Sequence, residues 1–275
     1  MDSDTFSNQK GWTNKLNALN EIRNLKLHKP ELVLKYGATL LTKHKWRLGT
    51  DYWNVCEDVF YASLDTLSPE WTDFTIKALR RQFGQTVRVM RMEGILFEHS
   101  GRFNEAMKIY EEMLTTNPLD AATWKRKIAL FRTTGKIDEA INTLNTYLET
   151  FQADIEAWEE LADIYLANQH FSQAAYCYEE IVLSSPENCW VILKYAEMLY
   201  SIGTLEKVNL ARKYFMQAII LNNQCTRAMW GLYQCCNFIK SGKPDDVNTK
   251  LLDKAKALLQ KAYQGSPIQI SNLLS

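Results

Sequence analysis

The chain has 275 residues, of which 46% are hydrophobic and 23% charged, a composition typical of a folded protein. Its 32 basic and 32 acidic residues cancel, which argues against recruitment of nucleic acid by an overall positive field. No run approaches the roughly 18 consecutive apolar residues that span a bilayer, so we expect no direct membrane span.

Residues 1–11 are polar, and we expect them to form a disordered tail without a secretory signal. Residues 12–86 have helical periodicity without a clear repeat, which predicts degenerate hairpins of the tetratricopeptide-repeat (TPR) type. Pro30 and Pro69 suit the first turns of helices, and Asp51 is expected as an N-cap. The six cysteines lack metal-ligand spacing, so we expect reduced, mostly buried thiols.

A repeat of 34 residues follows, and three copies are expected to begin at Val87, Ala121 and Ile155. The matching positions are Trp124 and Trp158; Gly101 and Gly135; Ala106, Ala140 and Ala174; and Tyr110, Leu144 and Tyr178. This period is that of the TPR, a helix–turn–helix unit. The small alanines suit a close approach of paired helices, which a larger side chain would overpack.

The repeat continues with insertions toward the C-terminus. Residues 87–223 are predicted to be regular repeats, residues 224–267 an interrupted hairpin closed by Pro267, and residues 268–275 a tail. One insertion lies around residues 203–209 and a longer loop at residues 240–248. The sequence thus predicts an all-α TPR solenoid of about 14 helices in seven hairpins, with a long concave surface.

No pattern indicates catalysis or a cofactor, and we expect neither. The four histidines are scattered, and His170 falls in a predicted turn between helices. Gly94 and Gly101 occupy repeat positions, one for close packing and one for a turn, instead of forming a phosphate-binding loop.

Charge is segregated along the chain. Residues 10–47 carry nine bases and two acids, residues 145–206 eleven acids and one base, and residues 207–261 ten bases and three acids. These segments are either ordinary solvated helix faces or distinct docking regions that orient partners.

First-helix positions of the repeats supply the candidate protein-binding residues, because first helices line the concave face of a TPR. The basic candidates are Arg88, Arg91, Lys125, Arg126 and Arg132, and the acidic candidates are Glu156, Glu159, Glu160 and Asp163. Chaperone-binding TPR domains grip a C-terminal carboxylate with Lys, Asn and Arg at such positions. Arg91 and Arg126 fit that clamp, but Glu156 and Glu160 would repel a carboxylate.

Several segments resemble one TPR family, subunit 2 of the endoplasmic-reticulum (ER) membrane protein complex. They are residues 102–118 (RFNEAMKIYEEMLTTNP), 144–151 (LNTYLETF), 157–165 (AWEELADIY), 212–223 (RKYFMQAIILNN) and 231–233 (GLY). The resemblance covers roughly residues 45–240.

That resemblance implies a non-enzymatic scaffold, peripheral to the ER membrane on its cytosolic face. Its partners would be the cytosolic and membrane-embedded subunits of a hetero-oligomer that inserts tail-anchored and multipass proteins. Two alternatives stay open at this point. One is a chaperone adaptor that binds C-terminal peptides, and the other is the alpha subunit of a protein prenyltransferase, which the alanine ladder disfavours.

Overall fold

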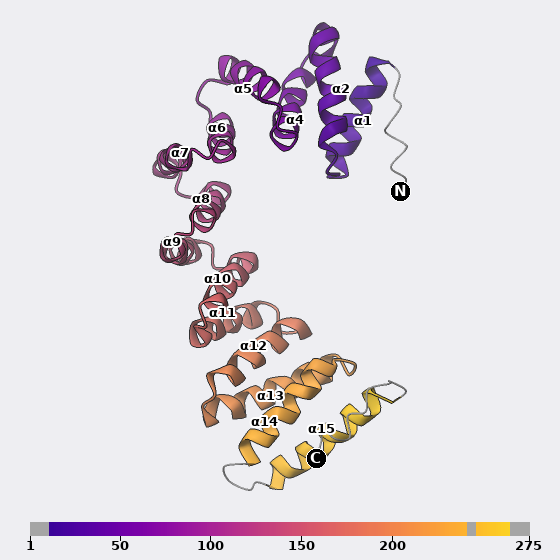
Figure 1. Ribbon diagram of the computed structural model, residues 1–275, viewed down its shortest axis with the longest axis vertical. Helices are drawn as coiled ribbons and strands as arrows, with labels where there is room; N and C mark the ends of the chain where they lie inside the picture. Colours follow the sequence, from indigo (N-terminus) through magenta and orange to yellow (C-terminus); the bar gives the residue numbers. More distant parts are fainter. Residues whose placement is uncertain (1–10, 241–245, 265–275) are drawn as a thin grey trace. The chain divides into compact units, whose positions relative to one another are not determined.

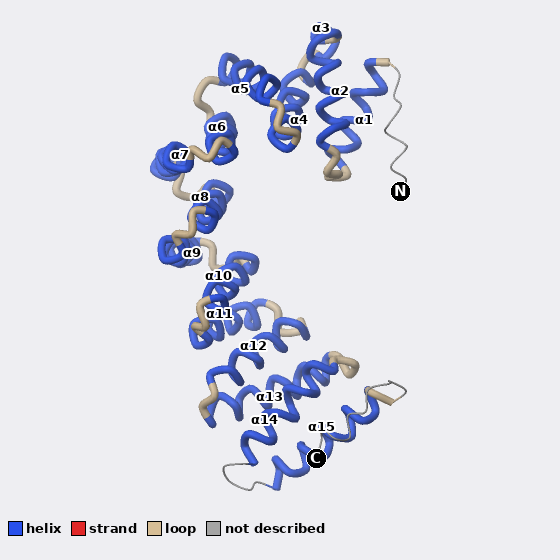
Figure 2. Tube along the Cα trace, in the orientation of Figure 1, coloured by secondary structure: helices blue, strands red, loops and turns tan. Residues whose placement is uncertain are grey.

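A computed structural model describes residues 11–240 and 246–264, and over those residues the chain folds into 15 α-helices without a strand (Figures 1 and 2). The prediction of an all-α TPR architecture is confirmed. Residues 1–10, Pro267, the predicted C-terminal tail and residues 241–245 of the predicted loop lie outside the described residues.

The chain divides into two compact units, residues 1–135 and 136–275. The division falls within the predicted regular segment 87–223, whose boundaries remain a prediction. The first unit contains α1 (Trp12–Asn24), α2 (Pro30–Lys43), α3 (Lys45–Leu48), α4 (Asp51–Asp65), α5 (Pro69–Phe83), α6 (Val87–His99), α7 (Phe103–Thr116) and α8 (Ala121–Thr133).

The second unit contains seven helices over its described residues. They are α9 (Ile137–Thr150), α10 (Ile155–Ala167), α11 (Phe171–Ser184), α12 (Cys189–Ile202), α13 (Leu205–Leu221), α14 (Thr226–Lys240) and α15 (Asp246–Ala262). Each of these helices packs against the next one in the chain, as expected for stacked hairpins (Figure 1).

The repeat register is confirmed by helix starts and by side-chain contacts. Helices α6, α8 and α10 begin at Val87, Ala121 and Ile155, the three predicted positions. Trp124 donates its indole N–H to the carbonyl of Pro118 at 2.8 Å, and Trp158 donates to Gln152 at 2.9 Å. The two donors are 34 residues apart in the sequence, and so are the two acceptors, so the same local structure recurs in successive repeats.

The predicted ladder residues form the contacts between paired helices. Ala106, Ala140 and Ala174 are fully buried, as are Tyr110 and Tyr178. Gly94 on α6 lies directly against the Tyr110 ring of α7, where a Cβ would lie 2.4 Å from a ring carbon. Gly101 has φ +70° in the turn between these helices, so both predicted glycine roles are confirmed.

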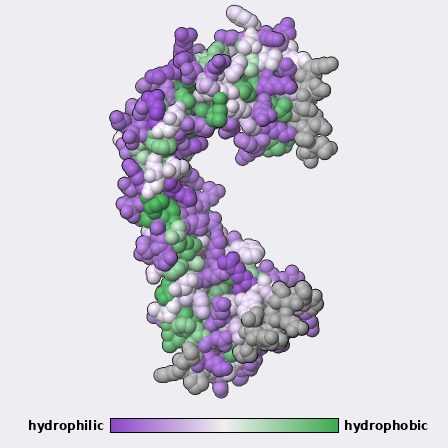
Figure 3. Space-filling view, in the orientation of Figure 1, coloured by the Kyte–Doolittle hydropathy of each residue, from purple (hydrophilic) through white to green (hydrophobic). Residues whose placement is uncertain are grey.

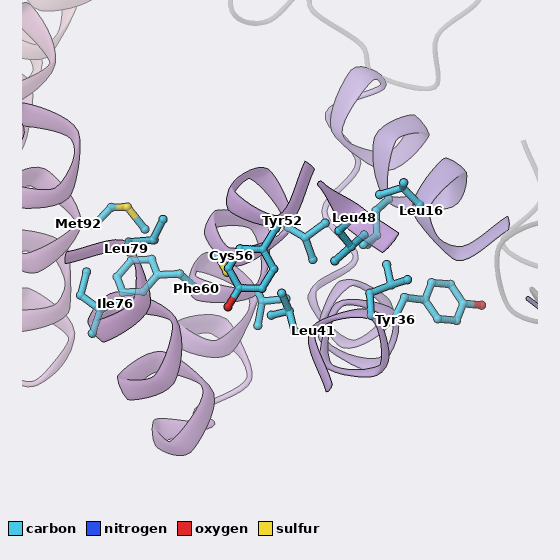
Figure 4. Packing of buried hydrophobic residues seen from close by; sticks show 14 of the residues in the cluster. Leu16, Tyr36, Leu41, Leu48, Tyr52, Cys56, Phe60, Ile76, Leu79 and Met92 are labelled. Carbon is cyan, nitrogen blue, oxygen red and sulfur yellow. The ribbon is translucent and has the colours of Figure 1, made fainter. Parts of the chain in front are cut away.

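The first unit has a continuous core that runs from α1 to α6 (Figure 4). Leu16, Leu48, Phe60, Leu79 and Met92 from five different helices take part in it. Because each hairpin buries only part of its apolar surface, the core extends from one hairpin to the next.

Most residues predicted to begin a helix or to lie in a turn are at the expected positions. Pro30 and Pro69 begin α2 and α5 as predicted, and exposed His170 immediately precedes α11. Asp51 is the first residue of α4 and not its N-cap, which is Thr50, so that prediction was wrong. At this position the Asp51 carboxylate still lies near the positive end of the helix dipole.

Five of the six cysteines are buried, and Cys189 is partly buried; all six are free thiols. Burial raises the pKa of Cys177 and Cys235 to about 12, so these thiols stay protonated at neutral pH. Among the residues that the structure describes, no helix combines the length and the apolar character needed to cross a membrane.

Candidate protein-binding surfaces

The nine predicted binding residues lie on first helices in both units. The basic ones lie on α6 (Arg88, Arg91) and α8 (Lys125, Arg126, Arg132) of the first unit. The acidic ones lie on α10 (Glu156, Glu159, Glu160, Asp163) of the second unit. Each set is therefore a surface of its own unit.

On α6, two arginines pair with carboxylates from neighbouring hairpins. Arg88 forms an ion pair with Glu57 of α4, and Arg91 donates to Asp120, the residue before α8, at 2.7 Å. The Arg91 and Asp120 side chains are only 28% and 12% exposed. Burial would raise the pKa of Asp120, but hydrogen bonds from Thr123 and Arg91 outweigh it and hold that pKa below its ordinary value.

On α8, Arg126 makes the corresponding connection back to α6. Its guanidinium lies 3.5 Å from the carboxylate of Glu98, which also accepts a 2.5 Å hydrogen bond from the Tyr110 hydroxyl. Burial, followed by this bond to Glu98, raises the pKa of Tyr110, so the phenol stays a hydrogen-bond donor.

We call Arg88, Arg91 and Arg126 with their partners Glu57, Asp120 and Glu98 the arginine-braced face. Its pairs join residues 31, 29 and 28 positions apart, roughly one repeat. The sequence predicted these arginines on first helices, where the structure has them, but it did not predict their carboxylate partners. Their role in binding a partner stays a prediction. Their charges are already compensated within the unit, so the face favours bracing of successive hairpins over capture of a free carboxylate.

In the second unit, two of the predicted acidic residues face the next first helix. Burial alone would lower the pKa of Lys194 on α12, but its neighbours Tyr178, Glu159 and Asp163 outweigh burial and raise that pKa. The Lys194 ammonium also lies 5.5 Å from the centre of the Tyr178 ring. Glu159 and Asp163 of α10 thus interact electrostatically with Lys194 of α12, which is the one base of residues 145–206.

A groove of about 760 Å³ opens between the second helices α9 and α11, with α10 at its base. We call it the acid-rimmed groove. Apolar groups come from Leu148, Trp158, Leu161, Tyr165, Tyr176 and Cys177, and polar groups from Asn145, Glu149, Gln152, Ser172, Gln173 and Glu180. Figure 3 shows hydrophobic residues at the surface over α9 to α11, among hydrophilic ones.

The chemistry of this groove suits a peptide with an apolar ridge and basic flanks. The Trp158 and Tyr176 rings meet edge to face with centroids 6.0 Å apart, and Tyr176 remains 57% exposed. Glu149 and Glu180 supply carboxylates from opposite helices. Amphipathic helices are commonly bound in such apolar grooves, with charged residues around the edge.

The acid-rimmed groove was not predicted from sequence, because most of its lining comes from the second helices α9 and α11 and not from first helices. A usable signal was present: Tyr176, which lines the groove, is a large apolar residue at a position of α11 that does not repeat as core, and it is exposed. It occupies neither of the repeating core positions of that helix, Ala174 and Tyr178.

Stacked helical hairpins with a 34-residue period, in which the indole–backbone hydrogen bonds of Trp124 and Trp158 recur, define a TPR protein. A family model described as the EMC2 TPR-like repeat domain matches residues 85–209.

Relatives match much more of the chain. ER membrane protein complex subunit 2-B of Xenopus laevis is 39% identical over 239 residues, which are 85% of this chain and 80% of that protein. ER membrane protein complex subunit 2 of Dictyostelium discoideum is 35% identical, covering 77% of this chain and 66% of that protein. TPR repeat protein oca3 of Schizosaccharomyces pombe is 30% identical, covering 68% and 67%. The chain belongs to the ER membrane protein complex subunit 2 family.

Proposed function

We propose that this chain is a non-enzymatic scaffold subunit of an ER membrane protein complex. It lies on the cytosolic face of the ER, peripheral to the membrane. There it holds the cytosolic part of the complex to the membrane-embedded subunits, and so supports insertion of tail-anchored and multipass proteins.

The observation that carries this proposal is the similarity to relatives named as subunit 2, which extends over 85% of the chain. The geometry adds a reason why the chain suits a scaffold. Inter-repeat ion pairs stiffen the first-helix side of the first unit, and the acid-rimmed groove offers a docking place on the second. A rigid repeat surface loses little conformational entropy of its own when it binds a partner.

Within this proposal, the acid-rimmed groove takes a basic, amphipathic segment of another subunit. Its apolar base excludes water from the contact, and Glu149 and Glu180 set the register of the basic flanks. Charge steers the encounter, because residues 145–206 carry eleven acids against one base.

The chaperone-adaptor alternative is less well supported by the geometry. A carboxylate clamp needs cations available to a ligand, whereas Arg91 and Arg126 already pair with Asp120 and Glu98. A C-terminal peptide would have to displace both carboxylates. The prenyltransferase alternative has no support from the TPR relatives.

Cell fractionation with depletion tests the proposed function. The chain should sediment with ER membranes and be released by high pH, and its depletion should lower the amounts of several partner subunits. A free cytosolic monomer whose depletion leaves those subunits unchanged would overturn the proposal.

A further inference from the structure

A second surface of the first unit is basic and aromatic, and it is separate from the arginine-braced face. It consists of the C-terminus of α2, the short helix α3 and the exposed side of α5. We call it the basic-aromatic face, and its residues are Lys43, Lys45, Trp46, Arg47, Phe74, Lys77 and Arg81. We propose that this face contacts an anionic phospholipid surface, with Trp46 inserted among the headgroups.

The position of Trp46 is the first observation. Its side chain is 98% exposed, although tryptophan is usually among the most buried residues on average. The cause is local: α3 is a single helical turn anchored by Leu48, which is 3% exposed in the core (Figure 4). Residues two apart on a helix point about 200° apart, so burial of Leu48 directs Trp46 outward.

Cations flank this indole on both sides. The Lys45 ammonium lies 5.0 Å from the centre of the Tyr52 ring, and the Arg47 guanidinium lies 5.9 Å from the Trp12 ring. These contacts orient the Lys45 and Arg47 side chains, whose charged groups stay at the surface. Lys43 is exposed at the end of α2, separated from α3 by a single residue, and α3 joins α2 to α4 at this point (Figure 2).

Beside α3 lies a recess of about 450 Å³ with more basic and aromatic groups. Lys45, Lys77 and Arg81 line it together with Tyr52, Trp53 and Phe74, and no carboxylate lines it. Asp73 pairs with Lys77 at 3.3 Å from the edge. In the part of the chain that the structure describes, Lys43, Lys45, Arg47 and Arg81 have no carboxylate partner.

This combination fits a lipid headgroup layer better than a folded protein or a nucleic acid. Tryptophan with Lys and Arg is the side-chain set enriched at membrane–water interfaces, where indole sits at headgroup level and cations meet phosphates. An indole that projects from the surface would need a matching recess in a protein partner, whereas a headgroup layer adapts to it. The inference does not rest on the proposed function, because it needs only this chain and lipid.

Binding of the purified full-length chain to vesicles tests the proposal. The probes are vesicles of phosphatidylcholine alone and vesicles with about 30 mol% phosphatidylserine, compared by sedimentation. We expect binding to the anionic vesicles only, weakened by high salt because exposed charges are screened. Trp46→Ala should weaken binding roughly tenfold, and Lys43→Gln with Arg81→Gln by at least as much.

Trp190→Ala is the matched control, since Trp190 is also exposed, at 61%, but lies within the acidic stretch. It should bind as wild type does, and circular dichroism should show the same helix content for all variants. Equal binding to neutral vesicles, or equal loss in Trp46→Ala and Trp190→Ala, would overturn the proposal. Failure of the wild-type chain to bind either kind of vesicle would also overturn it, and if Trp46→Ala then lost a protein that co-purifies with wild type, the face would be a protein-binding surface.

Discussion

The first unit carries two basic surfaces, and they differ in what surrounds their cations. On the arginine-braced face, Arg88, Arg91 and Arg126 each pair with a carboxylate of another hairpin. On the basic-aromatic face, cations gather around exposed aromatic rings. A count of positive residues therefore says little about docking, because pairing decides whether a charge stabilises the fold or stays available to a partner.

Packing behind the arginine-braced face should give the largest effect. In Gly94→Val the new side chain would meet the Tyr110 ring, displace it and disturb the bond from Tyr110 to Glu98. Because three atoms of the Tyr110 side chain lie within 3.0 Å of the new Cβ, we expect a loss of about 3 kcal/mol in the free energy of unfolding, the upper end of the usual range for an overpacked core, measured by urea denaturation. Ala129→Val on the exposed side of α8 is the control, and an equal loss there would contradict this account.

Removing one cation from each basic surface compares them directly. Arg91→Leu leaves the nearly buried Asp120 without its ion partner, so we expect a loss of about 1–3 kcal/mol. Arg81→Leu removes an exposed cation without a carboxylate partner, and the free energy of unfolding should change by about 0.5 kcal/mol or less. Similar losses in both variants would remove the distinction between the surfaces.

The free energy of unfolding should depend on pH with opposite signs for two arginine–carboxylate pairs, Arg91–Asp120 and Arg23–Asp58. The pKa of Asp120 is lowered in the fold, so its stabilising contribution is complete above the ordinary aspartate pKa of about 3.9. That contribution is lost as the pH falls through the folded value. Asp120→Asn should therefore be less stable than wild type near neutral pH, and the difference should shrink in acid.

Asp58, which pairs with Arg23, should behave in the opposite way. Burial outweighs Arg23 and raises the pKa of Asp58, so the folded state takes up a proton at higher pH than the unfolded state does. Wild type should then gain stability relative to Asp58→Asn as the pH falls through that range. Urea denaturation at a series of pH values measures both variants, and the same sign for both would contradict the assigned shifts.

Sequence was most informative where the repeat is regular. The starts of α6, α8 and α10 follow from apolar periodicity and turn residues, which are local signals. Helix α3 was missed because four residues are too few to show a period, and Asp51 was misplaced by one position.

The surfaces were harder to predict because they depend on contacts distant in sequence. Arg91 could be placed on a first helix, but its pairing with Asp120, 29 residues later, requires the stacking of two hairpins. The acid-rimmed groove likewise joins α9, α10 and α11, so no single segment contains its pattern.

The central claim is that this chain holds partner subunits, with the acid-rimmed groove as a docking place. Affinity purification of the tagged chain from detergent-solubilised ER membranes tests it, using Glu149→Lys with Glu180→Lys at the groove. Glu187→Lys with Asp253→Lys makes the same charge change at exposed positions outside the groove. We predict that the groove variant loses at least one subunit that wild type and the control variant retain. The same subunits in the same proportions from all three proteins would contradict the account.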